Sequence, residues 1–436
     1  MPDSLTTDNP SMRVFDQYES NVRAYCRSFP TVFESARGHL LTDQAGRRYI
    51  DFFAGAGALN YGHNPPPMKR ALIDYLTRDG ITHSLDMATS AKAAFIETFQ
   101  SVILQPRNMD HKLLFPGPTG TNSVESALKL ARKVTGRSGI ISFTNAFHGM
   151  TLGALAVTGN AFKRGGAGVG LSDGTVMPYD GYFGEDDDTL NWLATMLDDQ
   201  GSGVDLPAAV IVETIQGEGG LAAARFDWLK NLETLCGDRG MLLIVDDVQA
   251  GCGRTGPFFS FEPAGINPDI ICLSKSISGY GLPMAVTLVR PEHDVFDPGE
   301  HNGTFRGHNP AFITATCALD HWRDGALAGG THKRAGIIAE ALNRMAQSCP
   351  ELKPEVRGRG LMQGLALDGD GLAEQVSHEA FRRGVILETS GPASEVAKIM
   401  PPLTIPLEAL SDGLGRVAEA VDTVAMNARS AHARVA

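Results

Sequence analysis

The sequence of 436 residues predicts an α/β fold, in which a mostly parallel sheet is covered by helices. Short continuous apolar runs recur through the middle of the chain, and amphipathic stretches separate them. Runs of this length that are rich in Ile, Val and Leu are typical of strands buried on both faces. Two further apolar runs, at 49–53 and 360–367, lie near opposite ends of the chain. We therefore expect a large central domain and a smaller domain built from both termini.

The apolar runs give the expected order of elements. Five strands of the central sheet are predicted at 112–115, 139–143, 208–212, 241–245 and 270–273. The stretch 123–133 is predicted to be helical, because its apolar residues fall on one stripe of a helix. The glycine-rich stretch 163–174 is predicted to be a surface loop. The expected domains are an N-terminal segment of the small domain at 1–62, a large cofactor-binding domain at 63–320 and a C-terminal small domain at 321–436.

Composition excludes several classes of protein. Lys and Arg number 38 against 50 Asp and Glu, and the net charge of −12 argues against a nucleic-acid-binding protein. No apolar run approaches the ~18 residues of a membrane helix, and residues 1–11 lack the apolar core of a signal peptide. The six cysteines form no CxxC pair, and the histidines show no metal-ligand spacing. We expect a cytoplasmic protein with reduced thiols and no metal site.

Candidate functional residues follow the predicted strands, because ligands of open α/β sheets bind beyond the carboxyl ends of strands. Gly120 and Thr121 begin the helix after the first strand, where free N–H groups suit a phosphate; an ordinary capped helix is the alternative. Phe147, followed by His148, comes after the second strand. Phe147 is a candidate to stack on a cofactor ring, with a core aromatic as the alternative and a structural role expected for His148.

The last two predicted strands end in ionisable residues. Asp246 and Asp247 close a buried run, which is costly unless each acid has a partner; a turn or cap is the alternative. Lys275 follows the next run, where burial would lower its pKa and make its amine nucleophilic; an exposed lysine is the alternative. A phosphate cradle, a stacking aromatic, an acid for a ring nitrogen and a reactive amine together indicate pyridoxal 5′-phosphate.

Longer motifs resemble a known family. The segments 245–256 (VDDVQAGCGRTG) and 268–275 (PDIICLSK) resemble the signature of class III aminotransferases, and 119–125, 147–149 and 213–219 fit the same family in the same order. The resemblance extends from about Arg13 to about Val424. It implies a fold type I pyridoxal-phosphate enzyme, usually a homodimer or larger, whose active sites are shared between subunits.

The resemblance also implies a role for each matching position. Lys275 matches the Schiff-base lysine, Asp246 the partner of the pyridinium nitrogen, and Gln249 the contact to the ring hydroxyl. Phe147 matches the residue that stacks on the ring, and Gly120 and Thr121 match the phosphate site. Thr304 matches a threonine that reaches the phosphate of the neighbouring subunit.

Four further segments, at 25–33, 51–63, 78–89 and 302–307, resemble the diaminobutyrate–2-oxoglutarate transaminases of ectoine biosynthesis. These enzymes transfer the amino group of L-glutamate to the aldehyde of L-aspartate 4-semialdehyde, and the products are L-2,4-diaminobutyrate and 2-oxoglutarate. Met150 and Ala56 stand where ornithine transaminases carry Arg and Tyr, which weakens an ornithine assignment. The alternatives are another class III ω-aminotransferase acting on 4-aminobutyrate, ornithine or lysine, an aminomutase of the same fold, and a non-catalytic binding protein.

The substrate residues are less closely matched. Many relatives bind the glutamate carboxylate with an Arg before a Pro-Pro pair, and here Lys398 takes that place. Lysine is a point charge and cannot form the bidentate fork of arginine. Because Glu218 resembles the acid that gates this cation, we predict a Glu218–Lys398 pair in the substrate-binding site.

Overall fold

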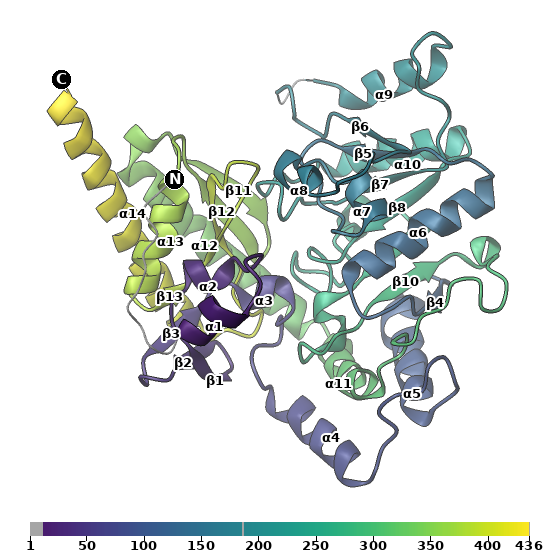
Figure 1. The fold of residues 1–436 in the computed structure, drawn as a ribbon, viewed down its shortest axis with the longest axis horizontal. Helices are drawn as coiled ribbons and strands as arrows, with labels where there is room; N and C mark the ends of the chain where they lie inside the picture. Colours follow the sequence, from purple (N-terminus) through teal and green to yellow (C-terminus); the bar gives the residue numbers. More distant parts are fainter. Residues whose placement is uncertain (1–11, 185–186, 436) are drawn as a thin grey trace.

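The computed structural model of the chain describes residues 12–184 and 187–435, arranged in two lobes (Figure 1). The larger lobe contains a seven-stranded sheet in the order β4-β10-β9-β8-β7-β5-β6. Its strands are β4 (Lys112–Leu114), β5 (Ile140–Phe143), β6 (Gly174–Met177), β7 (Ala209–Val212), β8 (Leu242–Asp246), β9 (Ile270–Leu273) and β10 (Val286–Val289). The strands from β9 to β6 run parallel, β10 pairs antiparallel with both β9 and β4, and β4 at the edge therefore runs in the same direction as the parallel strands. The mostly parallel sheet is therefore confirmed.

The five predicted strands of this sheet are present, and two strands were not predicted. β6 lies at the sheet edge and is only partly buried, so it lacks a continuous apolar run. β10 is fully buried, but it is followed by a short 3-10 helix at Pro291–His293 and an irregular segment before α11 begins at Asn309. The predicted surface loop at 163–174 needs a correction, because the short helix α8 (Ala161–Gly165) occupies its first residues and β6 begins at its last.

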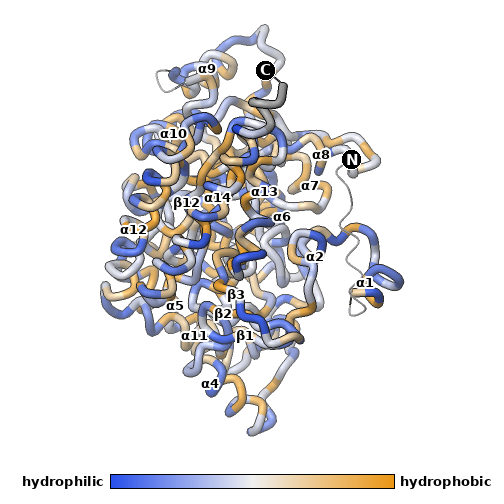
Figure 2. The backbone as a smooth tube through the Cα atoms, turned by 90° about the vertical axis from the view of Figure 1, so that its left-hand side faces the viewer, coloured by the Kyte–Doolittle hydropathy of each residue, from blue (hydrophilic) through white to orange (hydrophobic). Residues whose placement is uncertain are grey.

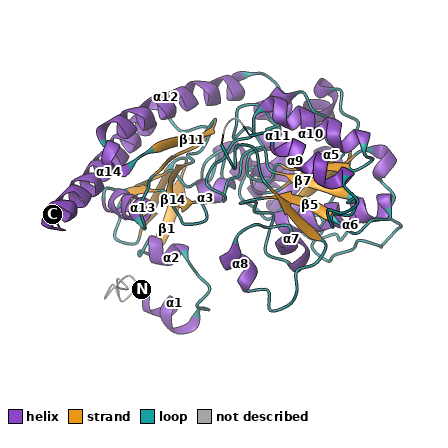
Figure 3. Cartoon of the chain, turned by 90° about the horizontal axis from the view of Figure 1, so that it is seen from above, coloured by secondary structure: helices purple, strands orange, loops and turns teal. Residues whose placement is uncertain are grey.

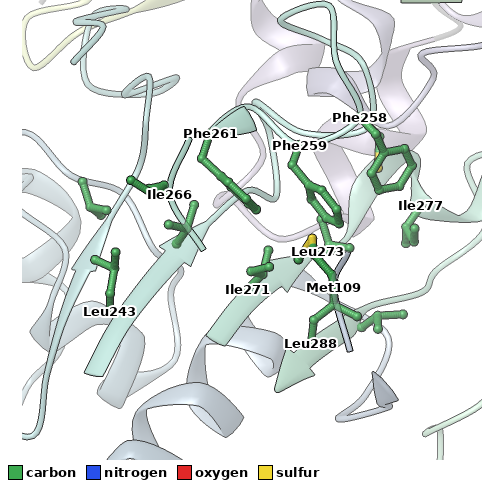
Figure 4. Close-up of a cluster of buried hydrophobic side chains, with 14 of the residues drawn as sticks. Met109, Leu243, Phe258, Phe259, Phe261, Ile266, Ile271, Leu273, Ile277 and Leu288 are labelled. Carbon is green, nitrogen blue, oxygen red and sulfur yellow. The ribbon is translucent and has the colours of Figure 1, made fainter. Parts of the chain in front are cut away.

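Alternate side chains of the strands enter two separate cores. Ile271 and Leu273 of β9 join a cluster with Phe258, Phe259 and other aromatic side chains, shown in Figure 4. Ile270 and Cys272 face the opposite side, where they pack with residues of α6 (Gly120–Thr135). Both faces of each strand are thus apolar, which is the reason for the continuous apolar runs in the sequence.

Helices enclose the large sheet in Figure 3. The helices of this lobe are α4 (Pro66–Thr77), α5 (Ser90–Phe99), α6 (Gly120–Thr135), α7 (Leu152–Ala156), α8 (Ala161–Gly165), α9 (Thr189–Asp198), α10 (Phe226–Asp238) and α11 (Asn309–Leu319). None of the described helices is long and apolar enough to cross a bilayer. Hydrophobic segments run through the interior in Figure 2, and hydrophilic segments occur at outer turns.

The smaller lobe joins the two ends of the chain. Its strands form two four-stranded sheets: β1 (Phe33–Arg37), β2 (Leu40–Asp43), β3 (Arg48–Asp51) and β13 (Val385–Ile386) in one, and β11 (Glu355–Arg359), β12 (Met362–Ala366), β15 (Val396–Ile399) and β14 (Glu388–Ser390) in the other. Its helices are α1 (Arg13–Tyr18), α2 (Tyr25–Ser28), α12 (Ala326–Ser348), α13 (Leu372–Arg382) and α14 (Leu407–Val435), and α3 (Ala54–Gly57) lies between the lobes. The parallel pairing of Val385 with Ile50 confirms a domain built from both termini.

The predicted domain boundaries at 62 and 320 stay a prediction. The core of the smaller lobe also includes Met68 and Ala318, which come from the predicted large domain. Residues 1–11 of the predicted N-terminal segment lie outside the described residues.

Candidate active site

Lys275 lies directly after β9 in a strained turn. Its φ of 51° is in the left-handed region, which costs of order 1–3 kcal/mol for a residue other than glycine and occurs mostly at functional sites. The flanking serines hold this turn in place: Ser274 Oγ donates to Met284 O at 2.8 Å, and Ser276 Oγ donates to Gly57 O at 2.6 Å. Contacts with the large lobe and with α3 therefore fix the backbone on both sides of the lysine.

The electrostatic surroundings of Lys275 favour a reactive amine. Burial lowers the pKa of Lys275, although the charges of Glu218 and Glu388 oppose this shift. A lowered pKa increases the fraction of uncharged amine near neutral pH, and the uncharged amine is the form that acts as a nucleophile or base.

Asp246 is the last residue of β8, the strand next to β9, and it is almost fully buried. Its Oδ2 lies 2.8 Å from Nδ1 of His148, whose ring is also buried. Burial alone would lower the pKa of His148, but the hydrogen bond and charge of Asp246 outweigh it and raise the pKa. His148 therefore holds the carboxyl group of Asp246 in one orientation.

The loop that carries Phe147 and His148 has a second anchor. Glu213 follows β7, and its Oε2 accepts a hydrogen bond from the backbone N–H of Phe147 at 2.9 Å. Burial raises the pKa of Glu213 to about 7, and His148 opposes the shift. Two neighbouring strand ends thus fix this loop: Glu213 through the backbone of Phe147, and Asp246 through the ring of His148.

Asp247 has a different environment from Asp246. Its carboxyl accepts hydrogen bonds from Ser260, through the backbone N–H at 3.1 Å and through the hydroxyl. Burial raises the pKa of Asp247 from 3.8 to about 7, although the hydrogen bonds from Ser260 oppose the shift. The two adjacent acids therefore serve separate purposes, and Asp247 is part of the core.

This environment of Asp247 predicts a pH-dependent stability. Between about pH 4 and pH 7 the folded protein keeps a proton on Asp247 that the unfolded chain has lost, so the free energy of unfolding falls as pH rises through this window. At about 1.4 kcal/mol per pKa unit, the free energy of unfolding of the wild type should fall by about 3 kcal/mol at most between pH 5 and pH 8 because of Asp247. In Asp247→Asn this contribution to the fall should be absent. Urea unfolding at both pH values measures the effect. An equal loss of stability in wild type and variant would contradict the assignment.

The N-terminus of α6 presents Gly120 and Thr121. Thr119 caps the helix together with Asn122, and the backbone N–H groups of Gly120 and Thr121 have no protein acceptor in the described part of the chain. A Cβ at position 120 would lie 2.9 Å from Cγ1 of Val248, so close packing against the loop after β8 requires glycine there. The free N–H groups are suited to an anion such as phosphate.

Lys398 is the centre of a buried cluster that joins both lobes. Its Nζ lies 3.0 Å from Glu388 Oε1, 3.4 Å from Glu218 Oε1 and 3.2 Å from Gln249 Oε1. The amide of Gln249 donates to Glu218 at 3.2 Å and to the carbonyl of Ala56 at 3.0 Å. The structure thus contains the Glu218–Lys398 ion pair that the sequence suggested, and it adds Glu388 and Gln249.

The pKa values of the two acids of this cluster shift in opposite directions. Burial alone would raise the pKa of Glu218, but the charges of Lys398 and Lys275 outweigh it and lower the pKa to about 2. Burial raises the pKa of Glu388 despite the charge of Lys398. Glu218 is therefore an ionised acid that interacts with the charges of both Lys398 and Lys275. Tyr25 from α2 covers Glu388 through a hydrogen bond of 3.3 Å to Oε2.

Thr304 is not part of these contacts. It lies on the segment between β10 and α11, is exposed, and its backbone oxygen is 2.7 Å from Nε2 of His83. Its predicted role toward a neighbouring subunit stays a prediction, as do the roles predicted for the other site residues.

Three residues of the site were missed by sequence reasoning. Glu388 faces Lys398 across the β14–β15 pair, and this register is not visible in the sequence. Glu213 was part of a family motif without an assigned role. His148 was expected to be structural, although its position beside Phe147 was a usable signal.

Comparisons with known proteins agree with this geometry. Residues 23–421 match the family Aminotransferase class-III. The chain is 60% identical over 410 residues to the diaminobutyrate–2-oxoglutarate transaminase of Halalkalibacterium halodurans, covering 94% of this chain and 96% of that protein. It is 57% identical over 422 residues to the transaminase of the same name from Sporosarcina pasteurii, covering 96% and 99%.

Solved structures confirm the predicted fold. The ornithine aminotransferase of Toxoplasma gondii superposes with a TM-score of 0.84 at 27% identity, over 97% of this chain and 96% of that chain. An S-selective transaminase from Arthrobacter sp. has the same fold, with a TM-score of 0.85 at 21% identity over 97% and 99%. Together with the match over residues 23–421, these findings show that the chain belongs to the class III aminotransferase family.

Proposed function

We propose that the chain is a pyridoxal-phosphate-dependent transaminase that moves an amino group from L-glutamate to the aldehyde of L-aspartate 4-semialdehyde, giving L-2,4-diaminobutyrate and 2-oxoglutarate. The observation that carries the proposal is the identity of 57–60% to diaminobutyrate–2-oxoglutarate transaminases over nearly the whole chain. The positions of Lys275 and Asp246 at the ends of adjacent parallel strands support the same chemistry.

The residues present fit pyridoxal 5′-phosphate. The N–H groups of Gly120 and Thr121 suit its phosphate, Phe147 its ring face, Asp246 its ring nitrogen, Gln249 its ring hydroxyl and Lys275 its aldehyde carbon. The buried Nε2 of His148 has no protein partner among the described residues, which indicates a polar group or water beside this end of the site. When bound, the cofactor withdraws electrons from the substrate carbon that carries nitrogen.

Lys275 performs the proton transfer in this account. Its Nζ, whose pKa burial lowers, would take the proton from the substrate carbon that carries the nitrogen and return it on the cofactor side. The strained turn and its serine contacts fix the backbone from which the Lys275 side chain extends during both transfers. In the second half of the reaction the same group moves the proton in the opposite direction.

Asp246 keeps a negative charge beside the ring nitrogen. His148 donates to Asp246 Oδ2 from one side, and the backbone N–H of Val248 donates to Oδ1 at 3.2 Å. Both contacts orient the carboxylate. An ionised Asp246 stabilises a protonated ring nitrogen, which makes the bound ring a better electron acceptor.

The proposal includes a homodimer with shared active sites, in which Thr304 of one subunit contacts the phosphate bound by the other. Exposed apolar side chains around this segment support it: Ile81, Leu85, Met87 and Phe305. Exposed apolar groups that gather in this way are typical of protein interfaces. We further propose a cytoplasmic location and a place in ectoine biosynthesis, which rest on the likeness to the diaminobutyrate transaminases.

The test of the proposed function is a substrate panel. Purified enzyme with pyridoxal phosphate is assayed with 2-oxoglutarate and, in parallel, diaminobutyrate, ornithine, 4-aminobutyrate and lysine. We expect the highest kcat/KM for diaminobutyrate. A higher kcat/KM for any of the other three amines would reject the substrate assignment and leave the transaminase assignment in place.

A further inference from the structure

The ammonium group of Lys163 is a cation at the site without a carboxylate partner. Lys163 belongs to α8, and its Nζ lies 4.0 Å from the centre of the Phe147 ring. Among the described residues its ammonium makes no hydrogen bond or ion pair. Its charge also contributes to the low pKa of Glu218, after those of Lys398 and Lys275, so it acts on the cluster around Lys398. Lys163 therefore contacts the ring of Phe147 and is close enough to Glu218 for its charge to act on that carboxylate.

Lys398 is less available to a substrate than Lys163. The Lys398 side chain is fully buried, and two carboxylates and an amide oxygen already surround its Nζ. A substrate carboxylate would have to displace Glu218 to reach it. Lys163 is only partly buried, and the face of an aromatic ring is a weaker partner for an ammonium group than a carboxylate.

Glutamate donates the amino group in the forward direction of the proposed reaction, and diaminobutyrate donates it in the reverse direction. The two molecules share one geometric feature. In glutamate the side-chain carboxylate carbon is three bonds from the carbon that carries the transferred nitrogen. In diaminobutyrate, which transfers its 4-amino group, the carboxylate carbon is also three bonds from the reacting carbon. One cation at a fixed distance from Lys275 is therefore able to bind the far carboxylate of either molecule.

We propose that Lys163 is the residue that binds this far carboxylate in both half-reactions. The inference rests on the proposed function and identifies Lys163 as a cation that contributes to the substrate specificity of the enzyme. The four-carbon stem of lysine lets the ammonium group leave the Phe147 ring and meet the carboxylate. In diaminobutyrate the 2-ammonium group next to that carboxylate then faces the ionised Glu218, so both charges of the amino-acid end are matched.

The experiment compares Lys163→Gln and Lys163→Arg holoenzymes with wild type. Diaminobutyrate is compared with 1,3-diaminopropane, which is the same diamine without its carboxylate. For Lys163→Gln we expect KM for diaminobutyrate to rise about 10-fold or more, as for loss of a hydrogen bond to a charged group, with kcat within about 3-fold. The kcat/KM for 1,3-diaminopropane should not change, and Lys163→Arg should retain most of the wild-type KM.

A binding measurement accompanies the kinetics. Glutarate is a non-reacting dicarboxylate with the spacing of 2-oxoglutarate, and its Kd from calorimetry should rise about 10-fold in Lys163→Gln. The matched control is Lys129→Gln, because Lys129 also lies over a phenylalanine ring, that of Phe296 at 5.4 Å, but on the exposed side of α6. This control should leave both the KM and the Kd at wild-type values.

Three results would overturn the inference. The first is an unchanged KM for diaminobutyrate in Lys163→Gln, and the second is an equal rise of KM for 1,3-diaminopropane. The third is weaker binding of pyridoxal phosphate with unchanged KM values, which would assign Lys163 to the cofactor phosphate. Each of them leaves the proposed function intact if the wild-type enzyme converts diaminobutyrate. A wild-type enzyme that does not react with diaminobutyrate rejects the proposed function, and this inference with it.

Discussion

Replacing Lys275 with alanine is expected to lower kcat by about 10,000-fold or more, the upper end of the range for loss of a positioned acid–base group. Lys275 lies in the turn after β9, its pKa is lowered by desolvation, and no other amine shares its strained turn. The variant loses both the covalent attachment of the cofactor and the base that moves the substrate proton. Steady-state assays with diaminobutyrate and 2-oxoglutarate measure the loss.

A second readout separates this result from misfolding. Borohydride treatment followed by mass spectrometry should add the mass of the cofactor to the wild type and not to Lys275→Ala. Lys275→Arg keeps the positive charge but cannot release its proton, so it should be as inactive as the alanine variant. Wild-type turnover in either variant, or a covalently bound cofactor in Lys275→Ala, would disprove the role of Lys275.

The second large effect is expected for Asp246→Asn, which should lower kcat by about 100- to 1,000-fold, the usual cost of removing one preorganised electrostatic group. The amide has nearly the same shape and still accepts a hydrogen bond from His148 or Val248, so the fold should be preserved. What is lost is the negative charge that holds a proton on the ring nitrogen. The KM values should change much less than kcat.

The neighbouring acid provides the matched control for this variant. Asp247→Asn is the same chemical change one residue further on, at a carboxyl that contacts Ser260 in the core. We expect Asp247→Asn to retain kcat within about 3-fold at pH 8, far from the effect predicted for Asp246→Asn. Equal losses of kcat in the two variants would show that Asp246 acts only on packing.

The sequence predicted those parts of the site that depend on local pattern. Asp246 and Lys275 stand directly after continuous apolar runs, and adjacent parallel strands bring their carboxyl ends to the same edge of the sheet. The start of α6 was predictable in the same way. To predict these positions, it was enough to recognise the apolar strands and to expect ligands beyond their carboxyl ends.

Contacts that depend on distant register were not predictable. Glu388 meets Lys398 because β14 and β15 pair at that register, and Tyr25 reaches Glu388 from a helix 363 residues earlier in the chain. His148 turns back to Asp246 across 98 residues of sequence, which no local pattern records. Edge strand β6 was missed because its partial exposure removes the apolar run that marks a buried strand.

The most direct test of the account follows the transferred nitrogen. Diaminobutyrate labelled with ¹⁵N at its 4-amino group is incubated with the enzyme, pyridoxal phosphate and 2-oxoglutarate, and the glutamate formed is analysed by mass spectrometry. We expect all of the glutamate to carry the label, and we expect label placed at the 2-amino group to stay in the other product. Glutamate labelled from the 2-position, or label moved within diaminobutyrate without formation of glutamate, would contradict it.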